Sequence, residues 1–231
     1  MDKLDPSRIL FEDNHLIAVN KLSGDLVQGD KTGDSILPDL IKEYIAVKYD
    51  KPRAVYLGVT HRLDRPTSGA VVFARTSKAL TRMNKLFSDR DTEKIYWAVV
   101  EGHVTKDKES LTHYLVRNPK QNKSYAHDHE VPNSKKATLH YQLLQRMDNY
   151  SLLEIKLETG RHHQIRSQLS KIGFAIKGDL KYGARRSNKD ASIHLHARSL
   201  SFIHPVRKEP VTFTAPVPVH DAIWNAIDKN L

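Results

Sequence analysis

A dense polar segment, 60-THRLDRPTSG-69, interrupts an otherwise apolar part of the sequence. Its carboxylate, Asp64, has the cations Arg62 and Arg65 on either side in the chain. A cation that lies close in space keeps a carboxylate ionised and lowers its pKa. An ionised Asp at the junction of a strand and a loop can act as a nucleophile or as a base. Taken alone, the segment is explained slightly better as a surface turn that Asp64 caps, with solvated arginines.

A second cluster of candidate functional residues is 158-ETGRHHQIRSQ-168. Its first residues predict a strand-to-helix turn, so the helix N-terminus and Arg161 would bind a phosphate. Arg161, Gln164 and Gln168 share one helix face by their i, i+3 and i+7 spacing. Arg166 lies about 100° around the helix from the apolar stripe, where it can turn its guanidinium into a cleft. Locally, an amphipathic helix with a basic outer face is the commoner explanation.

The chain has 13 His and no Cys, so a thiolate zinc site is excluded and the histidines are the residues that suggest a metal site. His194 and His196 alternate on an expected strand and form a possible pair of ligands, but no third ligand is near. The sequence has no His-Glu-x-x-His spacing, no Walker loop and no Gly-x-Gly-x-x-Gly or Gly-x-Ser-x-Gly motif. We therefore predict neither a metal ion nor a cofactor.

The charge balance is strongly basic, with 37 Lys and Arg against 27 Asp and Glu and a net charge of +10. Such a surplus favours a polyanionic partner, since each neutralised phosphate releases condensed counterions. A solvated basic surface that serves solubility explains the charge about equally well. The excess is spread along the chain, so charge alone does not decide between the two.

The chain of 231 residues predicts one domain, residues 1–231. No window approaches the roughly 18 consecutive apolar residues of a membrane span. The N-terminus carries charges where a signal peptide needs an apolar stretch. We expect a cytoplasmic protein.

The elements that position both clusters follow from hydrophobic periodicity and turn residues. The segment 117–136 is polar and aperiodic and is predicted to be a mobile loop. Ser77 is predicted to cap the second helix. Because strands outnumber helices, we predict an α+β fold with a mixed, largely antiparallel sheet and flanking helices. The expected strands are 8–12, 15–20, 69–74, 95–100, 137–147, 151–158, 194–203 and 211–214, and the expected helices are 35–49, 78–88, 161–172 and a short one from about His220.

The motifs together resemble one known family. The segment 61-HRLDRPTSG-69 resembles the His-Arg-Leu-Asp-x-x-Thr-Ser-Gly signature of the RluA-type pseudouridine synthases. Further resemblances follow in the family's order over nearly the whole chain: 20-NKLSG-24, 94-KIYWAVVEG-102, 159-TGRHHQIR-166 with 178-GDLKYG-183, 194-HLHA-197 with 202-FIHP-205, and 215-APVP-218. This resemblance implies the pseudouridine synthase fold with a catalytic cleft.

Two departures touch the N-terminal edge of the expected substrate site. Leu22 replaces the usual Pro, and 27-VQG-29 replaces the common Val-His-Pro. Larger members of the family carry a small S4-type RNA-binding domain ahead of the catalytic one. Here the first catalytic block begins by about residue 9, so we expect a catalytic domain without that module.

The resemblance also implies a reaction without cofactor or metal. Uracil leaves the glycosidic carbon of a uridine in RNA, turns, and rejoins the ribose through its carbon 5. Asp64 matches the catalytic aspartate, as nucleophile or base, and Arg166 the arginine that pairs with it. Tyr96 matches the tyrosine that lies against the base, and Arg62 the residue that enters the RNA stack when the base is extruded.

The remaining predictions concern binding. We predict that Lys21, His61, Arg161 and Gln164 bind substrate, and we expect a monomer whose partner is RNA, with no obligate protein partner. Four lysines of the expected loop, Lys120, Lys123, Lys135 and Lys136, are candidates for phosphate contacts.

Three alternatives stay open. Ribosomal RNA and tRNA are not separated as substrates by the sequence. A basic RNA-binding or chaperone module without catalysis is disfavoured, because Asp64, Tyr96 and Arg166 are all present. A metal-dependent hydrolase is a distant third.

Overall fold

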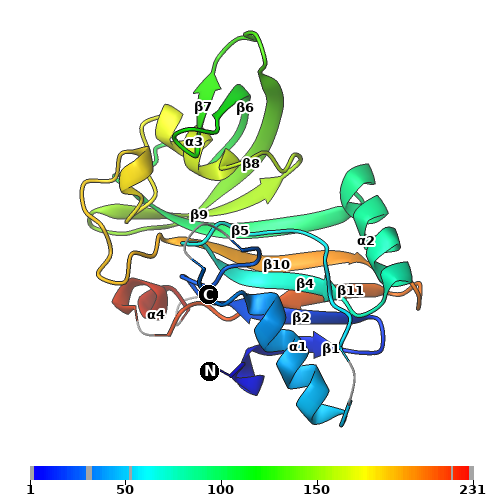
Figure 1. The fold of residues 1–231 in the computed structure, drawn as a ribbon. Helices are drawn as coiled ribbons and strands as arrows, with labels where there is room; N and C mark the ends of the chain where they lie inside the picture. The colour runs from blue at the N-terminus through cyan, green and yellow to red at the C-terminus, as the bar shows by residue number, and fades with distance from the viewer. Residues whose placement is uncertain (1–2, 30–32, 52–53, 220, 229–231) are drawn as a thin grey trace. The chain divides into compact units, whose positions relative to one another are not determined.

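The computed structural model describes residues 3–29, 33–51, 54–219 and 221–228. These residues form an α+β fold with a largely antiparallel sheet (Figure 1). Two compact units divide the chain. Unit 1 comprises residues 1–93 and 197–231, and unit 2 comprises residues 94–196.

Unit 1 contains a sheet in the order β1-β2-β4-β10, in which β3 pairs with β4 and β11 pairs with β10. Its strands are β1 (Ile9–Glu12), β2 (Leu16–Lys21), β3 (Gly58–Val59), β4 (Ser68–Ala74), β10 (Leu195–Ile203, which begins at the unit boundary) and β11 (Pro210–Thr214). Its helices are the 3₁₀ turn η1 (Pro6–Arg8), α1 (Leu37–Lys48), α2 (Ser77–Asp89) and α4 (Ala222–Asp228).

Alternation along β2 and β4 builds a separate core on each face of this sheet, because successive side chains of a strand point to opposite faces. Ile17 and Val19 pack with residues of α1, whose buried side chains include Ile41. Leu16 and Ala18 belong to the cluster that contains Ala79 and Met83 of α2. Every residue of β4 is therefore buried, as its apolar run predicts.

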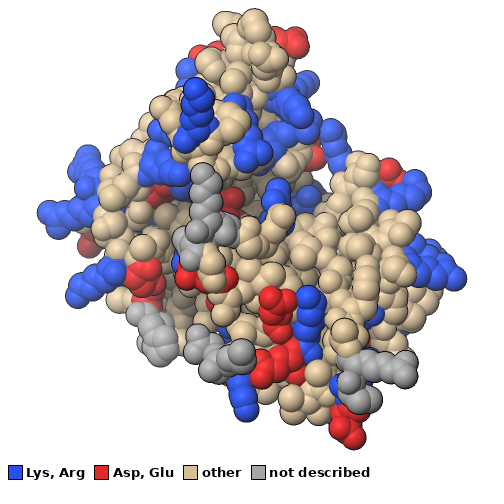
Figure 2. Space-filling view, viewed as in Figure 1, with Lys and Arg blue, Asp and Glu red and all other residues tan. Residues whose placement is uncertain are grey.

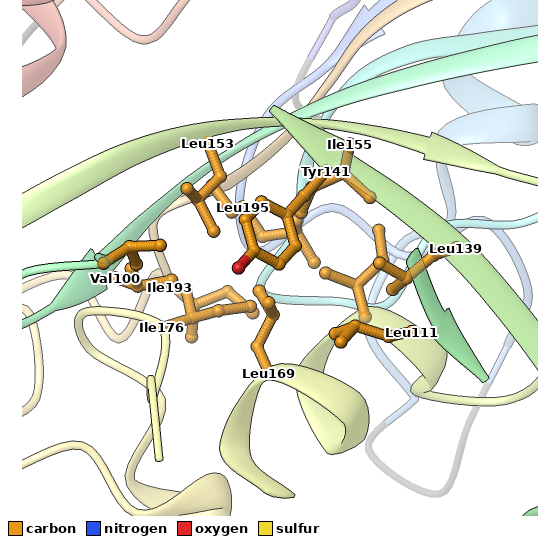
Figure 3. Packing of buried hydrophobic residues seen from close by; sticks show 13 residues of the cluster. Val100, Leu111, Leu139, Tyr141, Leu153, Ile155, Leu169, Ile176, Ile193 and Leu195 are labelled. Carbon is orange, nitrogen blue, oxygen red and sulfur yellow. The ribbon is translucent and has the colours of Figure 1, made fainter. Parts of the chain in front are cut away.

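Unit 2 has the strand order β5-β9-β8-β6-β7, and all of these pairs are antiparallel. Helix α3 packs Leu169 into the cluster formed by Leu139, Tyr141, Leu153 and other residues of these strands (Figure 3). The strands are β5 (Thr92–Glu101), β6 (Lys108–Asn118), β7 (Lys123–His127), β8 (Lys135–Arg146) and β9 (Tyr150–Leu157), and the helical segments are α3 (Gln164–Lys171) and the 3₁₀ turn η2 (Leu180–Tyr182).

The prediction of a loop over the whole range 117–136 is wrong, because strands occupy part of it. Strand β6 runs to Asn118, β7 occupies Lys123–His127, and β8 begins at Lys135. These segments escaped the sequence analysis because their faces are mostly polar, so that apolar alternation is weak. The two prolines, Pro119 and Pro132, lie in the turns between the strands, where their missing N–H is not required.

Two predicted helix starts also need correction. Thr76, not Ser77, caps α2, since its Oγ1 accepts a hydrogen bond from the Ala79 amide at 3.1 Å. Helix α3 begins at Gln164 instead of Arg161, because His163 adopts a left-handed conformation with φ 51°. The predicted start of the last helix, His220, lies outside the described residues. Among the described residues, no helix is long and apolar enough to span a membrane.

Candidate active site

The polar segment 60–69 of unit 1 connects β3 to β4 and is tied to β4 by side chains. The Thr60 hydroxyl donates to the Val72 carbonyl at 2.6 Å, and the Val72 amide donates to His61 Nε2 at 3.1 Å. The His61 ring also lies against the Phe87 ring, with 4.8 Å between the ring centroids. The predicted substrate-binding residue His61 is thus an anchor for the start of the loop.

Lys21 fixes the other end of this loop. It is fully buried, and its Nζ donates to the carbonyls of Leu22 at 3.0 Å, Arg65 at 3.0 Å and Thr67 at 2.7 Å. Burial lowers the pKa of Lys21 to about 8, opposed by the negative charges of Asp25 and Asp64. The geometry makes Lys21 a brace for the backbone that carries Asp64.

The backbone conformation and the surroundings of Gly69 explain why the segment 60–69 ends in glycine. It has φ +118°, and a Cβ there would lie 2.3 Å from the Ala197 carbonyl oxygen. Any side chain would therefore collide with the backbone of the neighbouring strand β10 and strain its own backbone. Only glycine allows the loop to enter β4 at this point.

Asp64 is half-buried on the braced loop, whereas Arg62 and Arg65 are exposed. Arg62 Nη1 donates to Gln28 Oε1 at 2.6 Å. Arg65 Nη2 forms an ion pair with Asp34 at 2.6 Å. Gln28 stands where the family commonly has His, so this departure from the family pattern bears directly on how Arg62 is held.

Arg166 lies in α3 of unit 2 and is buried, with 5% of its surface exposed. Its Nε and Nη2 donate to the two carboxylate oxygens of Asp179 at 2.6 and 2.8 Å. Such a forked pair fixes the guanidinium plane. The interpretation of this helix as amphipathic with a basic outer face is wrong, because the residues of α3 from Gln164 to Leu169 are all buried.

Gln164 and Arg161, both predicted to bind substrate, have different surroundings. Gln164 is buried, and its Oε1 accepts hydrogen bonds from the Thr159 hydroxyl at 2.8 Å and the Arg161 amide at 3.0 Å. Its Nε2 donates to the Thr138 carbonyl at 3.1 Å. Gln164 therefore closes the turn that precedes α3. The Arg161 side chain is exposed and donates from Nε to the Lys136 carbonyl at 3.3 Å.

Tyr96 is half-buried on β5 of unit 2 and packs against the hydrophobic cluster of this unit. It pairs in register with Ile155 of β9. Lys94 lies two residues earlier and hence on the same face of the strand. Burial lowers the pKa of Lys94. Tyr96 and the desolvated Lys94 are thus neighbours on the same face of β5.

Asp179 and Tyr182 are the functional candidates that the sequence analysis missed. Asp179 is 1% exposed and binds Arg166, and Tyr182 places its ring 4.9 Å from the Arg166 Cζ. Both belong to the block 178–183, which carried the family resemblance without an assigned role. That block was the signal that could have identified them.

Cations and metal ligands complete the description. Figure 2 shows Lys and Arg side chains gathered over the part of unit 2 that holds β6, β7 and β8.

Among the residues that the structure describes, no group of three or more His, Asp or Glu side chains is placed to hold a metal ion. His194, one of the two candidate ligands, instead pairs its Nδ1 with Asn188 Nδ2 at 3.0 Å.

Comparisons with known proteins identify the family. The family described as RNA pseudouridylate synthase matches residues 15–171. The chain is 33% identical over 225 residues to ribosomal large subunit pseudouridine synthase D of Zymomonas mobilis, covering 92% of this chain and 70% of that protein. It is 35% identical over 228 residues to the protein of the same name from Xylella fastidiosa, covering 92% and 66%. The chain thus spans about two thirds of the length of these relatives.

A solved structure shows the same fold. The human RNA pseudouridylate synthase domain containing 4 superimposes with a TM-score of 0.77 at 24% identity, covering 92% of this chain and 89% of that one. The fold and the matched sequence define an isomerase that acts on RNA. The chain belongs to the RNA pseudouridylate synthase family.

Proposed function

We propose that this chain converts specific uridines of ribosomal RNA to pseudouridine, with Asp64 as the catalytic carboxylate. The braced loop is the observation that carries the proposal. Lys21 fixes the backbone just after Asp64, through the carbonyls of Arg65 and Thr67, and His61 anchors the backbone before it, while Asp64 itself stays half-buried. A catalytic group needs such a fixed backbone, because an error of about 1 Å in position costs roughly 100-fold in rate.

The substrate follows from the names of the relatives. The proteins from Zymomonas mobilis and Xylella fastidiosa are named for the ribosomal large subunit, which supports ribosomal RNA over tRNA. The net charge of +10 supports a polyanionic substrate in either case. We further propose that the chain acts as one catalytic domain, as a monomer and in the cytoplasm.

The reaction breaks the bond between the ribose and uracil N1 and forms a bond from the ribose to uracil C5. The proton on C5 leaves, and N1 gains a proton, so that the product is an isomer. Asp64 acts on the ribose, either as a nucleophile or as a general base. Tyr96 lies against the uracil ring and assists removal of the C5 proton. Arg166 pairs with Asp64 as its positively charged partner. Arg62 enters the RNA stack as the base leaves.

The other predicted binding residues take two kinds of role. Lys21, His61 and Gln164 are positioning residues, since their polar atoms hold backbone groups of the protein. Arg161 has an exposed side chain and contacts a phosphate of the RNA. Neither a metal nor a cofactor takes part, so excess chelator leaves the activity unchanged.

The test is the variant Asp64→Asn, which keeps the size of the side chain and removes its charge. We expect it to abolish tritium release from RNA that carries 5-tritiated uridine. Asp39→Asn is the matched control, because Asp39 is an exposed carboxylate on α1 of the same unit. Activity of Asp64→Asn near that of wild type would remove Asp64 from the catalytic role.

The target is tested separately, by mapping pseudouridines in total RNA from cells with and without this protein. We expect the lost sites in ribosomal RNA. Loss from tRNA alone would move the substrate to tRNA. Tight RNA binding without any conversion would support the binding-module alternative.

A further inference from the structure

Tyr182 occupies a central position in unit 2 for which the proposed reaction gives no role. It ends η2 and is buried, with 4% of its surface exposed. The Arg166 Cζ lies 4.9 Å from its ring centroid. A guanidinium over an aromatic face is attracted by the ring quadrupole, and the attraction grows when water is excluded.

Asp179 and Tyr182 contact the guanidinium of Arg166 from different directions. Asp179 binds the Nε and Nη2 edge of Arg166, which fixes the guanidinium within its own plane. The Tyr182 ring lies against the face, which limits tilting out of that plane. The two residues are joined by the backbone, because the Tyr182 amide donates to the Asp179 carbonyl at 3.0 Å.

The hydroxyl of Tyr182 connects this residue to strand β7. It accepts a hydrogen bond from the Ser124 amide at 2.8 Å and lies 2.9 Å from His163 Nδ1. Burial lowers the pKa of His163 to about 2, so the ring is neutral and its Nδ1 can accept the hydroxyl proton. His163 also precedes the first residue of α3. One hydroxyl therefore connects β7 to the start of the helix that carries Arg166.

Charged and aromatic side chains continue outward from Tyr182. The Lys123 Nζ lies 5.1 Å from the Tyr182 ring centroid and 5.4 Å from that of Tyr125. Tyr125 is 40% exposed on β7. Cations and rings thus alternate from the buried helix to the surface of the hairpin formed by β6 and β7, in the order Arg166, Tyr182, Lys123 and Tyr125. A polyanion that binds the hairpin meets the outer end of this series.

We propose that Tyr182 is a positioning residue for pseudouridine formation: its ring orients Arg166, and its hydroxyl holds strand β7 in its RNA-binding position. The inference rests on the proposed function, because it takes Arg166 as the partner of Asp64, and it also takes Lys123 of β7, a predicted phosphate contact, as part of the RNA surface. Loss of the ring acts on turnover, whereas loss of the hydroxyl acts on RNA affinity. The two halves of the side chain are therefore separable by substitution.

The experiment compares Tyr182→Phe and Tyr182→Leu with the same two changes at Tyr141. Tyr141 is a matched control, since it is also 4% exposed in unit 2, lies in the hydrophobic cluster and donates its hydroxyl to Glu109 at 3.0 Å. Each variant is assayed by tritium release at saturating RNA and by RNA binding, below its own melting temperature. Losing the ring at either site lowers the melting temperature to a similar degree.

Tyr182→Leu is expected to lower kcat about 10-fold or more, and Tyr141→Leu to leave kcat within about 2-fold. Tyr182→Phe keeps the ring and is expected to restore kcat, while weakening RNA binding several-fold and increasing amide exchange at Ser124. Equal kcat values for Tyr182→Leu and Tyr141→Leu would overturn the role of the ring. Unchanged RNA affinity and exchange in Tyr182→Phe would overturn the role of the hydroxyl.

A measurement without turnover keeps this inference distinct from the proposed function. The Arg166 Nε–H resonance lies near an aromatic face and is expected to shift when Tyr182 becomes Leu but not when Tyr141 does. A wild-type protein without tritium release would contradict the proposed function alone. An unmoved Arg166 resonance in Tyr182→Leu would contradict the positioning role alone.

Discussion

The two segments that carry the candidate catalytic groups are held by different means. The loop 60–69 of unit 1 is fixed through its backbone, since Lys21 binds the carbonyls of Arg65 and Thr67. Arg166 of unit 2 is fixed through its own side chain, by a carboxylate and a ring. Hydrogen bonds to the backbone position whatever side chain the loop carries, whereas the contacts of Asp179 and Tyr182 are specific to one guanidinium. The two segments should therefore respond differently when a supporting residue is lost.

The largest effect is expected in unit 2, for Asp179→Ala. Asp179 and Arg166 are 1% and 5% exposed, so the variant leaves a buried cation without its forked partner. We expect the free energy of unfolding to fall by about 3–5 kcal/mol and turnover to fall with it. Chemical denaturation and tritium release measure the two quantities.

The control for this variant is Asp128→Ala in the same unit. Asp128 is 60% exposed and pairs with Lys171 at 2.8 Å. A solvent-exposed ion pair contributes little to stability, so this change should leave the free energy of unfolding nearly unchanged. If both variants had the same stability, the buried pair would not be the support of Arg166.

In unit 1, Lys21→Met should damage catalysis much more than stability. The buried ammonium is costly to desolvate, as its lowered pKa indicates, and this cost offsets much of what its hydrogen bonds contribute. We expect turnover to fall about 100-fold because the loop shifts, with a change in unfolding free energy of about 1 kcal/mol or less. Lys42→Met, at a half-buried lysine of α1, is the control. Wild-type turnover in Lys21→Met would show that the loop keeps its position without the brace.

The contrast also explains what could be predicted from the sequence. β4 and α1 were predicted within one or two residues, because their apolar runs and periodicity are local properties. Strand β7 was missed because its faces are mostly polar, and because one of its anchors, the Tyr182 hydroxyl, is 58 residues away. The brace of Lys21 was missed for the same reason, as its carbonyl partners Arg65 and Thr67 are 44 and 46 residues away.

The same distinction between local sequence and partners distant in the chain applies to the candidate site. The motifs identified Asp64, Tyr96 and Arg166 as candidates from the family resemblance. They did not distinguish residues that hold the protein backbone, such as Gln164, from residues that reach outward, such as Arg161. Residue type and spacing specify which groups are available, whereas partners distant in the chain decide how they are used.

A pH titration sharpens the assignment of Lys21. Its pKa is about 8 in the folded protein against 10.5 for an ordinary lysine. Between these values the unfolded chain binds more protons, so the free energy of unfolding rises with pH. We expect a gain of about 1–2 kcal/mol from pH 8 to 9.5 for the wild type relative to Lys21→Met. Urea denaturation of both proteins measures it, and the difference cancels other titrating groups. A difference that does not change with pH would contradict a desolvated ammonium.

The smallest expected effect compares surface lysines of the two units in RNA binding. Lys120, Lys135 and Lys136 are exposed in unit 2, whereas Lys123 is half-buried between tyrosine rings and is left in place. Each phosphate contact contributes about −0.7 to the slope of log K against log salt for single-stranded RNA. Replacing the three exposed lysines by Ala should therefore flatten the slope by about 2 at most and leave single-turnover conversion at saturating protein nearly unchanged.

The matched control is the triple Ala variant of three lysines on the helices of unit 1: Lys42, which is half-buried, and the exposed Lys78 and Lys85. It removes the same charge from the protein, so a general effect of net charge would flatten both slopes equally. A local contact surface on unit 2 would flatten only the first, because counterions are released where phosphates are neutralised. If only the control variant changed the slope, the RNA-binding surface would belong to unit 1, and Lys120, Lys135 and Lys136 would serve solubility instead.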